Sequence, residues 1–183
     1  ANLSNLTTGQ IQSFKTEQIA ALASANVTAL STDQIQALTT AQVAGLSSAQ
    51  LGTLGTGQMA ALLTHQVAAL QTADMRGLSS RQIQALSTDK LTLWNSSQMG
   101  VLNSDQVKGL LTGQVAALTT AQVVALSTDQ IVTLTTNQLA SLTTAQLAKM
   151  ETRDLAAVTT DQITALTTAQ IDRKSTRLNS SHG

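Results

Sequence analysis

The chain has 183 residues, of which 42% are hydrophobic, 11% are charged and 1% are aromatic, and it contains neither proline nor cysteine. Ten basic and ten acidic residues give a formal net charge of zero. The lack of cysteine excludes disulfides, thiol nucleophiles and cysteine-ligated metals, and the balanced charge argues against a nucleic-acid partner. The high apolar share with zero net charge argues against a composition-driven disordered chain.

An eight-residue repeat dominates the sequence. After a partial leading repeat at residues 1–5, the pattern runs through residues 6–171 as 21 units without an insertion. Leu38–Gly45 and Leu46–Thr53 are two successive units. In every unit the first and sixth residues are apolar and the third is Ser or Thr. The fifth residue is Gln in 17 units, and the exceptions are Asn26, Asp74, Lys90 and Asp154.

The spacing within each octad predicts a short α-helix. With Thr39 as the N-cap, Gln42 stands three residues later, which is the spacing of a capping box. Leu38 and Val43 then hold the positions of a hydrophobic staple across the helix start. Because the next octad brings another start signal, we expect helices of about six residues, one per repeat.

The sequence leaves open which hydroxyl caps each helix. The second position also accepts residues without a capping hydroxyl, whereas the third is always Ser or Thr. The third hydroxyl is therefore an alternative cap, with the Gln side chain reaching a neighbouring coil instead. The octads that lack a hydroxyl or a similar group at position two include those with Lys15, Ala23, Leu63, Gln71, Leu111 and Glu151.

Short helices require packing partners, because isolated helices of this length are unstable in water. One continuous helix fits poorly, since eight residues turn about 800° and its apolar stripe would drift. We therefore predict an all-α solenoid with a seam of first and sixth residues, and with small eighth residues that allow close approach. The alternative is a β-solenoid with Thr and Gln ladders, which the octad fits less well because its apolar positions do not alternate.

No group of residues in the sequence predicts catalysis, a cofactor or a metal ion, so we expect a protein that is not an enzyme. His65 is predicted to be an exposed polar residue, and His182 lies near the C-terminal end. Trp94 takes the place of a seam Leu and is expected to fill the core. Aspartates at the fourth position fall in the first helical turn, where the helix dipole favours a carboxylate; they are Asp33, Asp89, Asp105, Asp129 and Asp161.

The repeat stops at residues 172–183, where Lys174 stands in place of the expected Leu. This segment resembles the translation of a sequencing-library adapter. We therefore expect a disordered, non-native tail on a fragment assembled from short metagenomic reads. No stretch of the chain approaches the ~20 apolar residues of a membrane span.

The octad Leu-Thr-Thr-x-Gln-Val-x-Ala, repeated from Leu6 to Ile171, resembles tandem-repeat tracts of very large bacterial secreted or surface proteins. Such proteins carry adhesin-like or haem-utilisation labels. The resemblance implies an extracellular or cell-surface setting and neighbouring domains in the same long chain as partners. It implies no haem site here, because the repeats contain one His and no Cys.

Two functional hypotheses follow from the pattern. The first is a non-catalytic stalk or spacer that separates functional domains, since the units lack recurrent charge or aromatic surface. The second is a solenoid binding module for protein, glycan or ice, which the regular rows of Thr suggest.

Overall fold

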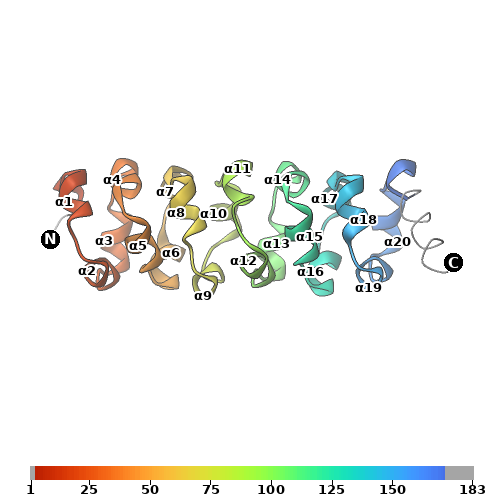
Figure 1. The fold of residues 1–183 in the computed structure, drawn as a ribbon, viewed down its shortest axis with the longest axis horizontal. Coiled ribbons are helices and arrows are strands. Elements are labelled where there is room, and N and C mark those ends of the chain that lie inside the picture. The colour runs from red at the N-terminus through yellow and green to blue at the C-terminus, as the bar shows by residue number, and fades with distance from the viewer. Residues whose placement is uncertain (1–2, 172–183) are drawn as a thin grey trace. The chain divides into compact units, whose positions relative to one another are not determined.

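The computed structural model describes residues 3–171, and within this range the chain is all-helical with no β-strand (Figure 1). The predicted tail at residues 172–183 lies outside the described residues. Within the described residues, the twenty helices α1 to α20 have four to six residues each and follow one another at one per octad. The chain divides into two compact units, residues 1–94 and 95–183, and each is described by itself.

The first unit opens with the 3-10 helix η1 (Leu3–Asn5). Its α-helices are α1 (Thr8–Gln12), α2 (Thr16–Ala20), α3 (Ser24–Thr28), α4 (Thr32–Ala37), α5 (Thr40–Ala44), α6 (Ser48–Thr53), α7 (Thr56–Ala61), α8 (Thr64–Ala68), α9 (Thr72–Met75), α10 (Ser80–Gln84) and α11 (Thr88–Leu91). The second unit holds α12 (Ser96–Gly100), α13 (Ser104–Lys108), α14 (Thr112–Ala117), α15 (Thr120–Val124), α16 (Thr128–Val132), α17 (Thr136–Ser141), α18 (Thr144–Lys149), α19 (Thr152–Ala156) and α20 (Thr160–Thr164).

The second residue of the octad is the N-cap, and the third is the first helical residue. In α5 the Thr39 hydroxyl accepts the Gln42 N–H at 3.2 Å, while the Thr39 N–H donates to Gln42 Oε1 at 2.8 Å. Leu38 and Thr39 both have extended backbone angles, so two residues separate α4 from α5. The described residues contain no positive φ angle, and the helix ends therefore need no left-handed glycine.

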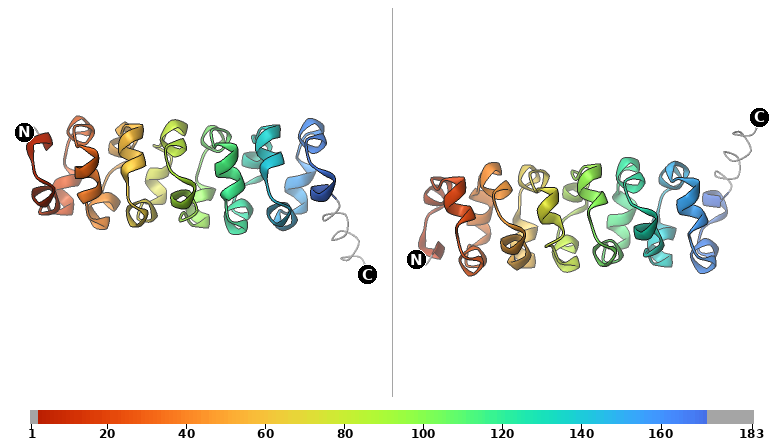
Figure 2. Two further views of the ribbon diagram at one scale, coloured as in Figure 1. Left: turned by 90° about the horizontal axis from the view of Figure 1, so that it is seen from above. Right: turned by 90° about the horizontal axis from the view of Figure 1, so that it is seen from below.

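Three octads complete one coil in each unit. Within each unit, helices three places apart pack on one another, which places octads 24 residues apart side by side (Figures 1 and 2). In the first unit the three stacks are α1·α4·α7·α10, α2·α5·α8·α11 and α3·α6·α9. In the second unit they are α12·α15·α18, α13·α16·α19 and α14·α17·α20. Each unit is thus the all-α solenoid that the octad predicted.

The seam is formed by the first and sixth residues of the octad, as expected. Ile35 and Val43 are fully buried, and Leu38 between them is 2% exposed. Trp94 is also 2% exposed, so it fills the core in place of the usual Leu. Since each helix has only one or two such residues, its stability depends on the coils that cover it.

Small eighth residues allow coils to approach closely, because they face the third residue of an earlier octad. A Cβ added to Gly45 would lie 2.5 Å from the Thr16 methyl group. A Cβ added to Gly77 would lie 2.6 Å from the main-chain oxygen of Ser48 and 3.0 Å from its Cβ. The two pairs are equivalent in the repeat, so this contact limits the size of both positions.

We expect Gly77→Ala to destabilise the fold by about 1–3 kcal/mol, because the new methyl group meets main-chain atoms that cannot move aside freely. The matched control is Gly57→Ala in α7, where an added Cβ has no atom within 4 Å. Replacing a helical glycine in open space should stabilise the protein by about 0.5–1 kcal/mol. Urea unfolding followed by circular dichroism measures both; equal effects of the two substitutions would contradict the close contact at Gly77.

Candidate functional site: the glutamine rows between coils

The fifth-position Gln joins two helix ends with one side chain. Gln66, at the start of α8, is fully buried. Its Oε1 accepts the main-chain N–H of Leu63 at 2.7 Å. Its Nε2 donates to the carbonyls of Ile35 at 2.9 Å and Leu38 at 2.6 Å, where α4 ends one coil earlier. The same amide group therefore satisfies a free donor at one helix start and free acceptors at another helix end.

These contacts recur through both units and form rows of buried glutamines. Gln42 repeats them on Ile11 and Phe14, and Gln146 repeats them on Val115 and Leu118. The sequence suggested that Gln either completes a capping box or reaches a neighbouring coil; the structure shows that it does both. The buried glutamines are Gln34, Gln42, Gln50, Gln58, Gln66, Gln82, Gln98, Gln106, Gln114, Gln122, Gln130, Gln138, Gln146, Gln162 and Gln170.

This double role explains why the second position tolerates residues without a hydroxyl. Leu63 and Leu111 have no side-chain cap, yet their N–H groups still donate to Gln66 and Gln114, at 2.7 and 3.0 Å. The fifth residue thus supports the helix start even when the second cannot. The third position is not the cap, and its small size is required by the packing on the eighth residue.

Lys90 replaces the fifth-position Gln in α11 and finds the same kind of partner. Its Nζ donates to the carbonyl of Ala60 at 2.6 Å, near the end of α7. This carbonyl is equivalent in the repeat to that of Gln36, which Gln66 contacts at 3.3 Å. Because an ammonium group has no acceptor, Lys90 cannot accept the Ser87 N–H as a Gln side chain would. The Ser87 hydroxyl makes no side-chain cap either.

Asp74 replaces the Gln in α9 and turns to the opposite end of a helix. A carboxylate needs donors, and Asp74 accepts the main-chain N–H of Ser48 at the start of α6. Burial raises the pKa of Asp74, and this hydrogen bond partly offsets the rise. The carbonyl of Ala44 is instead served by Gln71, whose Nε2 lies 2.9 Å away. This octad therefore carries its donating amide at the second position instead of the fifth.

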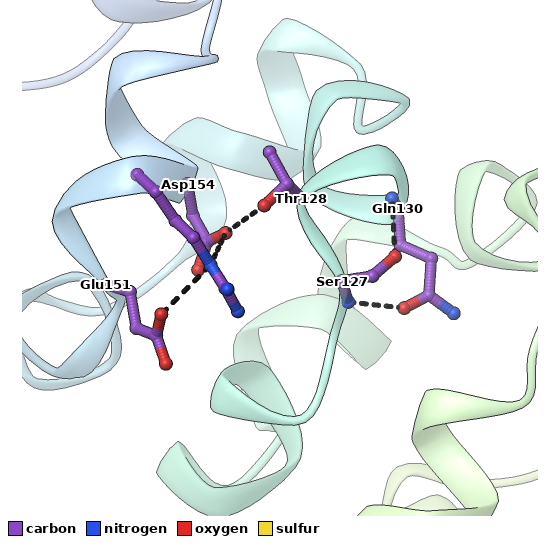
Figure 3. A network of polar contacts seen from close by, with 6 residues as sticks. Ser127, Thr128, Gln130, Glu151 and Asp154 are labelled. Carbon is purple, nitrogen blue, oxygen red and sulfur yellow. Dashed lines mark hydrogen bonds and ion pairs between the residues drawn. The ribbon is translucent and has the colours of Figure 1, made fainter.

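Asp154 in α19 follows the same rule as Asp74 (Figure 3). It is 4% exposed, and the hydroxyl of Thr128 at the start of α16 donates to its Oδ1 at 2.6 Å. Arg153 Nε lies 3.6 Å from the same oxygen and 2.9 Å from Glu151 Oε2. Figure 3 also shows the usual arrangement beside it, in which Ser127 and Gln130 cap each other across the start of α16.

The other residues considered from the sequence lie away from these rows. His65 is exposed on α8, and the fourth-position aspartates lie exposed in the first turns of their helices. His182 lies outside the described residues. Between residues 3 and 171 no group of three or more His, Cys, Asp or Glu side chains could hold a metal ion. Over the same range no helix is long and apolar enough to cross a membrane.

Replacing Gln66 by Leu keeps its volume but removes both ends of its amide. We expect a loss of about 2–4 kcal/mol, because the N–H of Leu63 and the carbonyls at the end of α4 lose a buried partner. Gln36→Leu, which changes an exposed side chain of α4, is the control and should change stability by less than about 0.5 kcal/mol. Urea unfolding measures the difference, and comparable losses in the two variants would contradict the role assigned to Gln66.

Gln71 and Asp74 should be energetically coupled. We expect Gln71→Ser to cost about 1 kcal/mol, because the carbonyl of Ala44 loses its donor. In an Asp74→Gln background the new fifth-position amide can serve that carbonyl, so the same Gln71→Ser change should cost close to nothing. A double-mutant cycle by thermal unfolding measures the coupling; equal costs in the two backgrounds would show that the residues act independently.

Comparison with known proteins agrees with the tandem repeat that the sequence and the structure show. The profile of the ALTTAQ repeat matches residues 1–40, 28–64, 67–112, 99–136, 107–144 and 147–173. These matches tile nearly the whole described range. A search of curated proteins found no match. The chain therefore belongs to the ALTTAQ repeat family.

Proposed function

We propose that this chain is a non-catalytic structural spacer that holds neighbouring domains of a longer protein at a fixed separation. The main support is the use of the fifth residue, the polar side chain that recurs in octad after octad. From Gln34 onward every fifth-position Gln of the described residues is buried, and Gln66 shows how this side chain binds one coil to the next through its contacts with α4. The recurrent polar side chain of the repeat thus holds successive coils together.

The nearest-neighbour pattern of contacts also suits a spacer. Each helix contacts helices one coil away, so each added coil extends the stack without changing the contacts already made. Separation is then set by the number of octads. The resemblance of the octad to repeat tracts of large bacterial adhesin-like proteins supports an exported, cell-surface setting for this spacer.

The proposal predicts that length grows in equal steps when coils are added to the first unit. Because the chain has no Cys, dyes can be attached at Gly9→Cys and Gly57→Cys in α1 and α7 of one stack, where an added Cβ has no atom within 4 Å. Each extra copy of residues 30–53 should lengthen the dye-to-dye distance by about 8–10 Å, the usual spacing of packed helices. Single-molecule energy transfer measures this distance.

The matched control inserts the same number of residues as a Gly/Ser sequence, which should extend the chain as a flexible coil whose length grows with the square root of residue number. If the octad insertions followed this square-root growth, or gave no regular step, the spacer proposal would be wrong. The variants should keep their helical circular dichroism signal, which confirms that the inserted coils fold.

A further inference from the structure

Two coils of the first unit differ in how their helices begin. In the coil of α4 to α6, residues 30–53, every helix has a hydroxyl cap and a complete capping box, and its fifth-position Gln is buried. In the coil of α9 to α11, residues 70–93, only α10 has these features. Among the described residues, α9 and α11 are the only α-helices of four residues. The later coil therefore has fewer bonds that stabilise its helix starts.

The polar links between this coil and the chain one coil earlier are also more exposed to water. Gln71 donates to the carbonyl of Ala44 and Lys90 donates to that of Ala60, and both hydrogen bonds are exposed. In the coil of α4 to α6, the amide of Gln42 instead makes a buried hydrogen bond to the carbonyl of Ile11. A buried hydrogen bond is stronger than one with which water competes. Residues 70–93 are therefore held less firmly to the preceding coil.

The carboxylate of Asp74 weakens α9 further. It accepts the main-chain N–H of Ser48, but burial raises the pKa of Asp74 in spite of this bond. The ionised form is thus less favoured in the folded coil than in the unfolded chain. At neutral pH the fifth position of α9 holds a charge at a cost that the neutral amide of a Gln does not carry.

We propose that residues 70–93 form the coil of the first unit that opens first, and that its opening lets the spacer lengthen under tension. The role under tension rests on the spacer function proposed above. Local opening begins where caps and buried contacts are fewest, and in a solenoid each coil contacts only its neighbours. A folded coil spans about 8–10 Å, whereas the same residues fully extended span roughly 80 Å. Opening this coil therefore adds length while the other coils stay packed.

Hydrogen exchange of the full chain, followed by mass spectrometry, tests the order of opening. After correction for intrinsic rates, the main-chain amides of residues 70–93 should exchange at least about tenfold faster than the equivalent amides of residues 30–53. The repaired variant Gln71→Thr/Asp74→Gln/Lys90→Gln restores the usual second- and fifth-position residues of α9 and α11. In this variant, exchange of residues 70–93 should slow by at least about tenfold, and exchange of residues 30–53 should change less.

The matched control is Arg81→Gln/Asp89→Gln, which also removes one positive and one negative charge from this coil. Both side chains are exposed at fourth positions, and the fifth-position residues stay unchanged. The control should not slow exchange. Equal exchange of the two coils, unchanged exchange in the repaired variant, or the same slowing in the control would overturn the proposal.

Stretching single molecules of the full chain tests the response to tension. Handles at Gly57→Cys and Gly113→Cys lie on either side of residues 70–93 in the sequence, at positions where an added Cβ has no atom within 4 Å. The first step should add roughly 70–80 Å of contour length and should need a higher force in the repaired variant. A first step that the repair leaves unchanged would overturn the role under tension. Dyes at Gly9 and Gly57 lie before this coil, so the spacer function is tested separately.

Discussion

The structure depends on one buried amide that serves two helix ends. An α-helix of five residues consists almost entirely of termini, because the first four N–H and last four C=O groups have no partner within the helix. Water would satisfy them at the surface, but close packing of coils removes water from the corners. Gln66 shows the solution: its oxygen accepts at its own helix start and its nitrogen donates at the end of α4. The side chain that caps the start of one helix therefore also links that helix to the coil before it.

The exceptions at the fifth position follow from donor and acceptor chemistry. Lys90, which can only donate, reaches a helix-end carbonyl as Gln does. Asp74 and Asp154 accept, so they turn to the start of a helix, where N–H and hydroxyl donors are found. The charge of each replacement thus selects which end of the helix it contacts. Since Asp74 cannot donate to the carbonyl of Ala44, Gln71 donates to it instead, and the octad keeps an amide at another position.

Repetition gives this fold its strength, because each coil is covered by its neighbours. Sixth-position residues are buried wherever a following coil exists and exposed where none is described, as the contrast between Ile35 and Ile163 shows. The fifth-position amides of the first described coil, those of Gln10 and Gln18, are likewise exposed, and no earlier coil is described beside them.

The octad by itself determined the local structure. Thr39 and Gln42 stand at capping-box spacing, Leu38 and Val43 form the seam, and the eighth residue is small, so short helices, their starts and their core could all be read from the residues. Tertiary structure decided which residue is the cap and how many octads form a coil. Nearly identical octads cannot reveal whether a helix packs on the second, third or fourth octad along the chain, because each choice offers the same side chains. The 24-residue register, and with it the partners of Gln66 and Gln71, follows only from how far the chain turns at each pair of extended corner residues.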